Sequence, residues 1–208
     1  MNPPYPVHYH VGSPLRFTRL QLLLRVVAFC ALGMIGLSFG AVFMCAYLAL
    51  PVIAAVRVSS RDAEAYVQED GPIIVDALRW FAAVSAWVGL ITDQVPSKTP
   101  DETVKIEIDR TVHPHPTPSS AIWRVVTGLP SAFALCVLCW IGAFVWMWAA
   151  LSILFVQRIG SGAFNFLVGL QRWSIRLLAY QASLVEEYPP FAFSDLAPPT
   201  LPAAHAAT

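Results

Sequence analysis

The sequence predicts an all-α integral membrane protein of two tandem helical hairpins, four membrane segments in total, with a short cytoplasmic β-strand before each hairpin. Three observations support this. The chain of 208 residues is 57% hydrophobic and only 12% charged, against roughly 25% charged in soluble domains. Two uncharged stretches, residues 26–56 and 125–156, each exceed the about 20 residues that a spanning helix needs. Short sequence words recur in the same order in both halves.

A weaker hydrophobic segment follows each long stretch. The first covers residues 73–92 and carries Asp76 and Arg79, and the second covers residues 163–185 and carries two arginines. Such segments either cross with the charged face turned inward or lie in the interface as amphipathic helices. The distribution of Lys and Arg among the loops favours four crossings, with both termini cytoplasmic.

The two halves match in order and spacing, which predicts an internal duplication. Residues 1–97 form the predicted first repeat, residues 98–194 the second, and residues 195–208 a disordered tail rich in Ala and Pro. The matching words are Arg25-Val26-Val27 with Arg124-Val125-Val126, and Arg79-Trp80 with Arg172-Trp173; the 93-residue offset of the second pair also aligns Asp93 with Glu186 and Pro96 with Pro189.

Residues 5–11 and 104–108 alternate between apolar and polar side chains, as in a β-strand. Because isolated short strands are marginally stable, we expect the two strands to pair with each other across the halves, on the cytoplasmic face. Residues 59–71 are predicted to form a polar loop, and residues 113–118 a rigid, proline-rich connector.

Residues 162–191 read GAFNFLVGLQRWSIRLLAYQASLVEEYPPF. The Gly-x-Phe-x-Phe-x-x-Gly word, the Arg-Trp-Ser-x-Arg word and the acidic Tyr-Pro-Pro-Phe ending closely resemble the bacterial membrane family known as domain of unknown function 4389. The resemblance implies a short strand, a long hydrophobic helix and an amphipathic helix, here over residues 104–194. It also implies a bacterial inner (cytoplasmic) membrane location, but no activity.

Residues 5–97 resemble a diverged second copy of the same unit. They keep the Arg-Trp word and an acidic residue, but have Ala83 where Arg176 stands, Trp87 for Tyr180, and Gln94-Val95-Pro96 for Glu187-Tyr188-Pro189. If the motif has a role, the second copy is therefore the expected carrier.

Polar and small residues at helical spacing form a stripe on the last predicted helix: Asn165, Gly169, Arg172, Arg176, Tyr180, Ser183 and Glu187. Two arginines four residues apart repel each other unless something anionic lies nearby. Candidates are Glu186 or Glu187, Asp76 of the other half, or a lipid phosphate. The predicted lipid- or partner-binding residues are Arg172, Arg176, Tyr180, Glu187, Arg79 and Asp76. The stripe is also what an ordinary packing and hydration face of the bundle would contain, and a catalytic or transport path is a further alternative.

Small residues in the first long stretch have the spacing of close helix contacts, with a GxxxG word: Gly33, Gly36 and Gly40. With Gly169 they are the predicted helix-packing glycines. Paired histidines at 8 and 10 and at 113 and 115 lack an accompanying cysteine or carboxylate cluster, so no metal site is predicted. Cys136 and Cys139 have the CxxC spacing but lie in an apolar run, so we expect no redox site and no cofactor.

These observations favour a non-catalytic accessory or scaffold subunit that packs against a partner membrane protein, another copy of itself, or membrane lipid. A small transporter or channel and an anionic-lipid-binding protein are the alternatives. No enzyme is predicted, because familiar catalytic words do not occur. Nucleic acid is not an expected partner, because the formal net charge is zero and Lys and Arg are not clustered.

Overall fold

The computed structural model describes residues 5–11, 16–34, 39–96, 104–108 and 114–193. The chain is mostly helical, with two short strands. Its elements are β1 Val7–Val11, α1 Arg19–Met34, α2 Phe39–Ser60, α3 Ala63–Ala65, the π-helix η1 Tyr66–Asp70, α4 Gly71–Val88, β2 Val104–Ile108, α5 Pro118–Val156 and α6 Ser161–Gln181. Within these described ranges, three helical stretches are long and apolar enough to cross a membrane: Gly40–Ser60, Ala63–Val88 and Pro118–Val156.

The predicted strand pairing is confirmed. β1 and β2 form a two-stranded antiparallel sheet in which Tyr9 pairs with Ile106 at the centre. Each strand buries its alternate apolar side chains and turns its polar ones outward, as period-two alternation requires. A strand from the first half of the chain is thus joined to a strand from the second half.

Three layers stack around α6, the central helix. The sheet packs on α4 and α6, while α2 and α5 pack on α6 as well as on each other. Arg172 and Arg176 of α6 face β1, whereas Leu170 and Gln181 face α5. The strand and α5 therefore contact opposite sides of α6, which is why nearly every side chain from Leu167 onward along α6 is buried.

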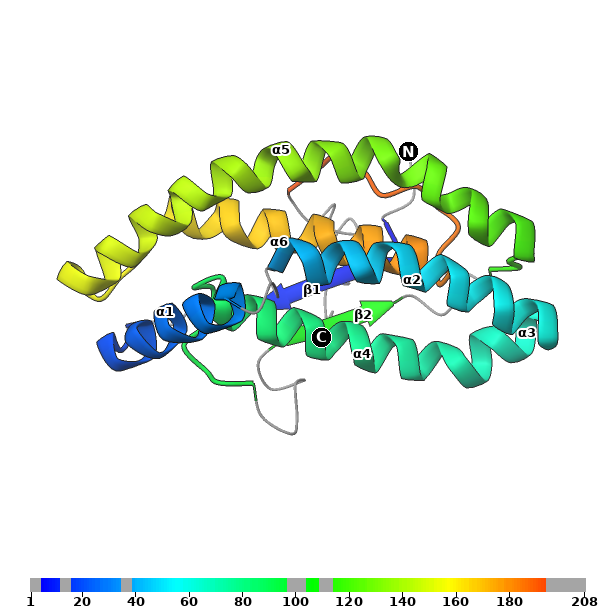
Figure 1. Cartoon of the computed structure of the whole chain (residues 1–208), viewed down its shortest axis with the longest axis horizontal. Helices are drawn as coiled ribbons and strands as arrows, with labels where there is room; N and C mark the ends of the chain where they lie inside the picture. The colour runs from blue at the N-terminus through cyan, green and yellow to red at the C-terminus, as the bar shows by residue number, and fades with distance from the viewer. Residues whose placement is uncertain (1–4, 12–15, 35–38, 97–103, 109–113, 194–208) are drawn as a thin grey trace, which may run out of the picture.

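The start and end of α5 follow from local sequence. Thr117 and Ser120 form a reciprocal capping box, and proline occupies the first helical turn, where its missing N–H costs nothing. Gln157 ends the helix in the left-handed conformation, at φ 57°. Between these two signals, 39 residues form one continuous helix, which arches along the whole molecule (Figure 1).

Several predicted boundaries differ from the structure. Residues 59–71 are not a loop, because α2 extends to Ser60 and α3 and η1 run directly into α4. The predicted long stretch 26–56 is divided between α1 and α2, with residues 35–38 outside the described part. α6 ends at Gln181 rather than near residue 185, and it is not among the helices long and apolar enough to cross. The predicted tail, residues 195–208, lies outside the described residues.

The direction of the helices also differs from the prediction. Four crossings in sequence require the two long helical stretches to run the same way through the membrane. In the structure α2 and α5 run in opposite directions alongside each other (Figure 1). The sequence could not supply this relationship, because it depends on how the two halves dock.

Candidate functional site: arginine contacts and an apolar face

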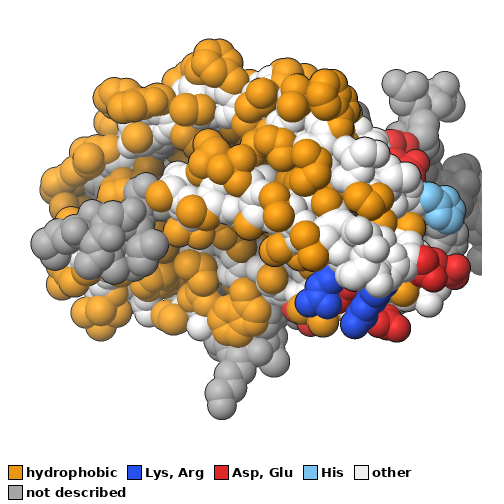
Figure 2. Space-filling view, turned by 45° about the vertical axis from the view of Figure 1, so that its right-hand side comes forward, with side chains coloured by type: hydrophobic (Ala, Val, Ile, Leu, Met, Phe, Trp, Pro, Cys, Tyr) orange, Lys and Arg blue, Asp and Glu red, His pale blue; other side chains and the backbone are white. Residues whose placement is uncertain are grey.

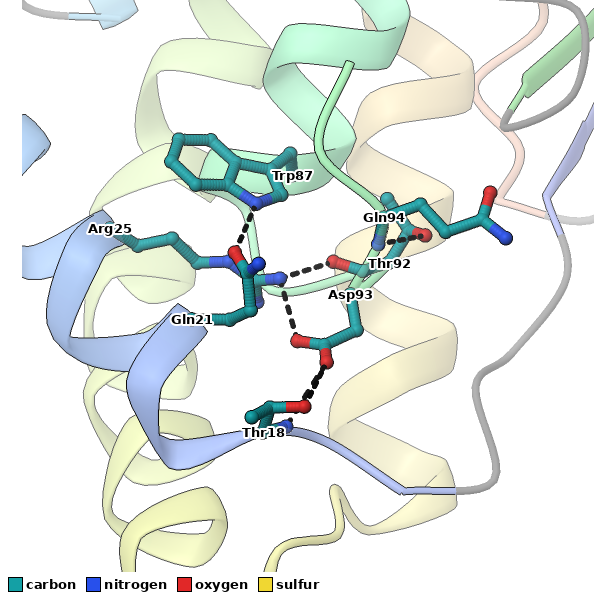
Figure 3. Close-up of polar contacts among 7 residues, drawn as sticks. All are labelled: Thr18, Gln21, Arg25, Trp87, Thr92, Asp93 and Gln94. Atoms are coloured by element: carbon teal, nitrogen blue, oxygen red, sulfur yellow. Dashed lines mark hydrogen bonds and ion pairs between the residues drawn. The ribbon is translucent and has the colours of Figure 1, made fainter. Parts of the chain in front are cut away.

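Arg25 of α1 is 1% exposed and lies against the end of α4 (Figure 3). Its guanidinium donates to the Thr92 carbonyl at 2.7 Å and to the Asp93 carboxylate at 2.9 Å, and it lies 5.4 Å from the Trp87 ring centre. Asp93 also accepts from the N–H and the hydroxyl of Thr18, the residue before α1. The contacts fix the start of α1 to the end of α4.

Arg124 of α5 makes matching contacts in the second half. Its guanidinium donates to the carbonyl of Tyr180 at 2.8 Å and of Val185 at 2.5 Å, and it lies 4.6 Å from the Tyr180 ring centre. Tyr180 and Val185 each lie 93 residues after the residue with the same role at Arg25. Those residues are Trp87 for the ring and Thr92 for the carbonyl. Glu186, 93 residues beyond Asp93, accepts from the backbone N–H of His115, just before α5.

The ends of α4 and α6 also match. Leu90 and Ser183, 93 residues apart, are both left-handed, with φ of 60° and 56°. In each case the next residue's N–H bonds back to a carbonyl five residues earlier, Ile91 to Ala86 and Leu184 to Ala179, at 2.9 and 3.2 Å. This is the Schellman ending of a helix, formed twice without the glycine that usually supports it.

Three predicted binding residues, Arg79, Arg172 and Arg176, lie beside the two-stranded sheet. Arg79 donates to the Ile106 carbonyl and Arg172 to the Tyr9 carbonyl, each at 3.4 Å, and those two residues are paired across the sheet. Arg176, 1% exposed, donates to the Val7 carbonyl at 3.4 Å. Since strand edges leave carbonyls unpaired, these arginines satisfy both edges of the sheet.

Arg172 and Arg176 also hold the C-terminal segment. They donate to the carbonyls of Phe193 and Ala192. Phe193 stacks edge-on against Phe166 and Trp173 of α6. The two arginines therefore connect α6 to both described ends of the chain through backbone carbonyls.

The other predicted site residues are not gathered around one ligand position. Asp76 pairs with Arg79 at 2.9 Å and is 66% exposed. Tyr180 shares a 2.9 Å hydrogen bond with Thr127 of α5. Glu187 lies beyond the end of α6 and is exposed, while its backbone carbonyl accepts from Tyr5 at 3.4 Å. Binding by these residues stays a prediction.

The glycines divide into two groups. A Cβ on Gly169 would lie 2.7 Å from the Phe193 ring, so Gly169 allows the C-terminal segment to approach α6. A Cβ on Gly40 would meet no described residue within 4 Å, so the predicted packing role of Gly40 stays a prediction. Gly36 lies outside the described residues, and the surroundings of Gly33 are not described either.

Sequence reasoning missed the glycines that bring α5 close to its neighbours. A Cβ on Gly128 would collide with the Gln181 amide and lie 2.9 Å from the Tyr47 hydroxyl. A Cβ on Gly142 would lie 2.9 Å from Leu170. Since they stand 14 residues apart, about four turns, they lie on one face of the helix, and a search for small residues at that longer interval could have found them.

Two tyrosines of the N-terminal segment were also missed. Burial raises the pKa of Tyr5 and of Tyr9 well above the ordinary value, and it does so against the positive charge of Arg176 and Arg172 respectively. The Tyr9 hydroxyl has no hydrogen-bond partner among the described residues. Both side chains are packing groups of the strand segment on α6, and both stay protonated at neutral pH.

The outer face of the molecule is apolar. Large side chains project outward along the full length of α5, among them Trp140 at 72% and Phe144 at 76% exposure, and α1 and α2 add more. Figure 2 shows apolar side chains over most of the visible surface, with charged ones at the lower right and along the right-hand side. A continuous apolar surface of this extent marks contact with a membrane or with protein.

Residues 118–192 match the family model described as Domain of unknown function (DUF4389). The match covers α5, α6 and the following segment, so it supports the family for the second half of the chain. No curated protein and no solved structure matches the chain. We therefore infer the function from the structure.

Proposed function

We propose that this protein is a non-catalytic integral membrane protein, an accessory or scaffold subunit that packs through its apolar face against lipid and a partner membrane protein. The supporting observation is the row of exposed aromatic and aliphatic side chains along α5, which no other element covers among the described residues. The bacterial cytoplasmic membrane, with both termini on its cytoplasmic side, is part of the same proposal.

The arginines support a structural rather than a catalytic role. Arg25, Arg124 and Arg176 are buried and donate to backbone carbonyls at helix ends and strand edges. Such contacts give a hydrogen-bond donor to backbone carbonyls that would otherwise be left unpaired. The positive charge also interacts favourably with the negative end of a helix dipole. Contacts of this kind hold segments of the fold together, which supports a structural role for these guanidinium groups.

We also propose that the chain arose by duplication of one unit of strand, long helix and shorter helix. The matched surroundings of Arg25 and Arg124, the matched ends of α4 and α6, and the matched contacts of Arg79 and Arg172 support it. Each half contributes a strand to the shorter helix of the other half, since β1 packs on α6 and β2 on α4. One half alone would lack this support.

The test is photo-crosslinking in native membranes. Benzoylphenylalanine replaces Trp140 or, in a second variant, Phe144, and the matched control places it at Glu107, which is exposed on the polar side of the sheet. We expect adducts with phospholipid and with one protein of defined mass from both α5 positions, and neither from the control. Sedimentation of the membranes should carry the protein with them.

A protein that remains in the supernatant after sedimentation would contradict the membrane placement. A membrane-bound protein whose α5 positions give no more adducts than Glu107 would contradict packing through the apolar face.

A further inference from the structure

Charge is segregated between the two sides of the molecule. The outward face of the sheet presents His8, His10, Lys105 and Glu107, whereas α5 on the opposite side of α6 carries only one charged residue, the buried Arg124. α2 is likewise uncharged until Arg57 near its end. A polar surface thus lies on the sheet side of α6, opposite the apolar face of α5, and further charged residues lie where α2 ends and α3 and η1 follow.

The length of α5 does not fit a simple crossing. Its 39 residues extend about 58 Å at 1.5 Å per residue, almost twice the roughly 30 Å thickness of the hydrocarbon core. The exposed apolar side chains run from Ile122 to Val156 and leave no polar section that could emerge into water. An upright helix would therefore expose long apolar segments on both sides.

The sheet also argues against a crossing. It lies alongside the middle of α4 and α6 rather than beyond their ends (Figure 1). If the helices stood upright, the sheet would lie at mid-depth with Lys105 and Glu107 pointing outward. Charged side chains and open strand edges are both strongly unfavourable in hydrocarbon.

Both ends of α5 have charged neighbours. Arg19 donates to the Phe155 carbonyl at one end, and Glu186 bonds to the His115 N–H at the other. Arg172 connects both described ends of the chain to the sheet side, through the Tyr9 and Phe193 carbonyls. Polar groups therefore lie at both ends of the apolar face of α5 as well as on the sheet side, as expected for a molecule that enters a bilayer from one surface.

We propose that the protein inserts into one leaflet, with the outer face of α1, α2 and α5 among the acyl chains and the sheet in water. α5 lies along the membrane and does not cross it. Both chain ends are then on the same side without any crossing. This inference rests on the proposed membrane placement and replaces the four crossings that the sequence suggested.

The test is labelling of single cysteines from one side at a time. In a background with the four native cysteines replaced by alanine, the variants are Ser119→Cys before α5's long apolar section, Ser161→Cys just after α5, and Glu107→Cys on the sheet, all exposed positions. Intact cells and inside-out vesicles are treated with a membrane-impermeant maleimide. We expect all three to react from the same side, and Trp140→Cys to react from neither.

Labelling of Ser119→Cys and Ser161→Cys from opposite sides would overturn the inference while leaving the membrane placement intact. Recovery of the protein in the soluble fraction would instead contradict the proposed function. His115→Cys and Gly162→Cys, also exposed, provide a second pair if a variant fails to accumulate.

A second measurement identifies what covers the apolar face. Purified protein is placed in vesicles of phosphatidylcholine with brominated acyl chains, where we expect strong quenching of tryptophan fluorescence, reduced in the variant Trp140→Leu. Unquenched fluorescence together with the mass of two copies would show that a second copy covers the face, and would overturn insertion into the leaflet.

Discussion

Arg25 and Arg124 occupy equivalent positions in the two halves of the chain. Each guanidinium lies over an aromatic ring, Trp87 or Tyr180, and donates to a backbone carbonyl five residues after that ring, Thr92 or Val185. Each is at least nine-tenths buried. The start of α1 is joined to the end of α4 in the same way as the start of α5 is joined to the end of α6.

Replacing Arg124 by methionine should destabilise the protein by roughly 2–4 kcal/mol, because two buried carbonyls lose their donor while the apolar volume is largely kept. The measurement is thermal unfolding in mild detergent, followed by tryptophan fluorescence. Arg158→Met is the control, since Arg158 is exposed and should change stability by no more than about 0.5 kcal/mol. Equal effects of the two substitutions would contradict the role of Arg124.

Gly128→Ala should destabilise the protein by about 1–3 kcal/mol, because the added methyl group collides with Gln181 and approaches Tyr47 in a packed contact. Gly162→Ala, near the start of α6, meets nothing within 4 Å and should be neutral or stabilising by up to about 1 kcal/mol. Unfolding midpoints of the two variants, measured side by side, test the close approach of α2, α5 and α6. An unchanged unfolding midpoint in both variants would contradict the close approach of these helices.

Asp93→Asn should cost about 1–3 kcal/mol, because the carboxylate accepts from buried Arg25 and from Thr18 and hydrogen bonds to charged groups are the stronger ones. Asp76→Asn removes a pair of the same type at an exposed position and should cost at most about 1 kcal/mol. The comparison requires only equilibrium unfolding at neutral pH. A larger loss of stability in Asp76→Asn than in Asp93→Asn would contradict the structural role of Asp93.

Tyr9→Phe should leave stability at neutral pH unchanged or slightly higher, because the buried hydroxyl has no partner among the described residues. Its pKa in the folded protein is raised by burial, so the unfolded chain ionises first, near pH 10. Ionisation of Tyr9 in the unfolded chain therefore costs no stability below about pH 10 and lowers the free energy of unfolding as pH rises from there toward the folded pKa. The free energy of unfolding, measured from pH 8 to 11, should fall less steeply with pH in the variant than in the original protein. Above pH 10 the two slopes should differ by about 1 kcal/mol per pH unit.

Patterns local in sequence predicted much of the fold. Period-two alternation located both strands, and the uncharged stretches located the apolar helices, because burial and membrane contact act on each segment separately. The recurrence of Arg79-Trp80 as Arg172-Trp173 predicted equivalent positions, and both arginines do bond to paired residues of the sheet.

Relationships between segments could not be predicted in the same way. Nothing in the local sequence says that β1 packs on α6 rather than on its own half, or that α2 and α5 run in opposite directions. The stripe on α6 suggested a carboxylate or a lipid phosphate as partner, because two arginines four residues apart repel each other. Their acceptors include the backbone carbonyls of Val7, Tyr9 and Phe193, and a backbone carbonyl carries no residue-type signal in the sequence.

The depth of α5 in the bilayer tests the account most directly. Nitroxide labels are attached by cysteine substitution at Phe133, Trp140, Phe144 and Phe155, all exposed on α5, and at Lys105 as the aqueous control. Collision rates with oxygen and with a water-soluble nickel complex give the depth of each label. We predict that all four α5 labels lie within a single leaflet, while Lys105 remains accessible to nickel. A depth that rises and then falls along α5, passing through the bilayer centre to the far surface, would contradict the account.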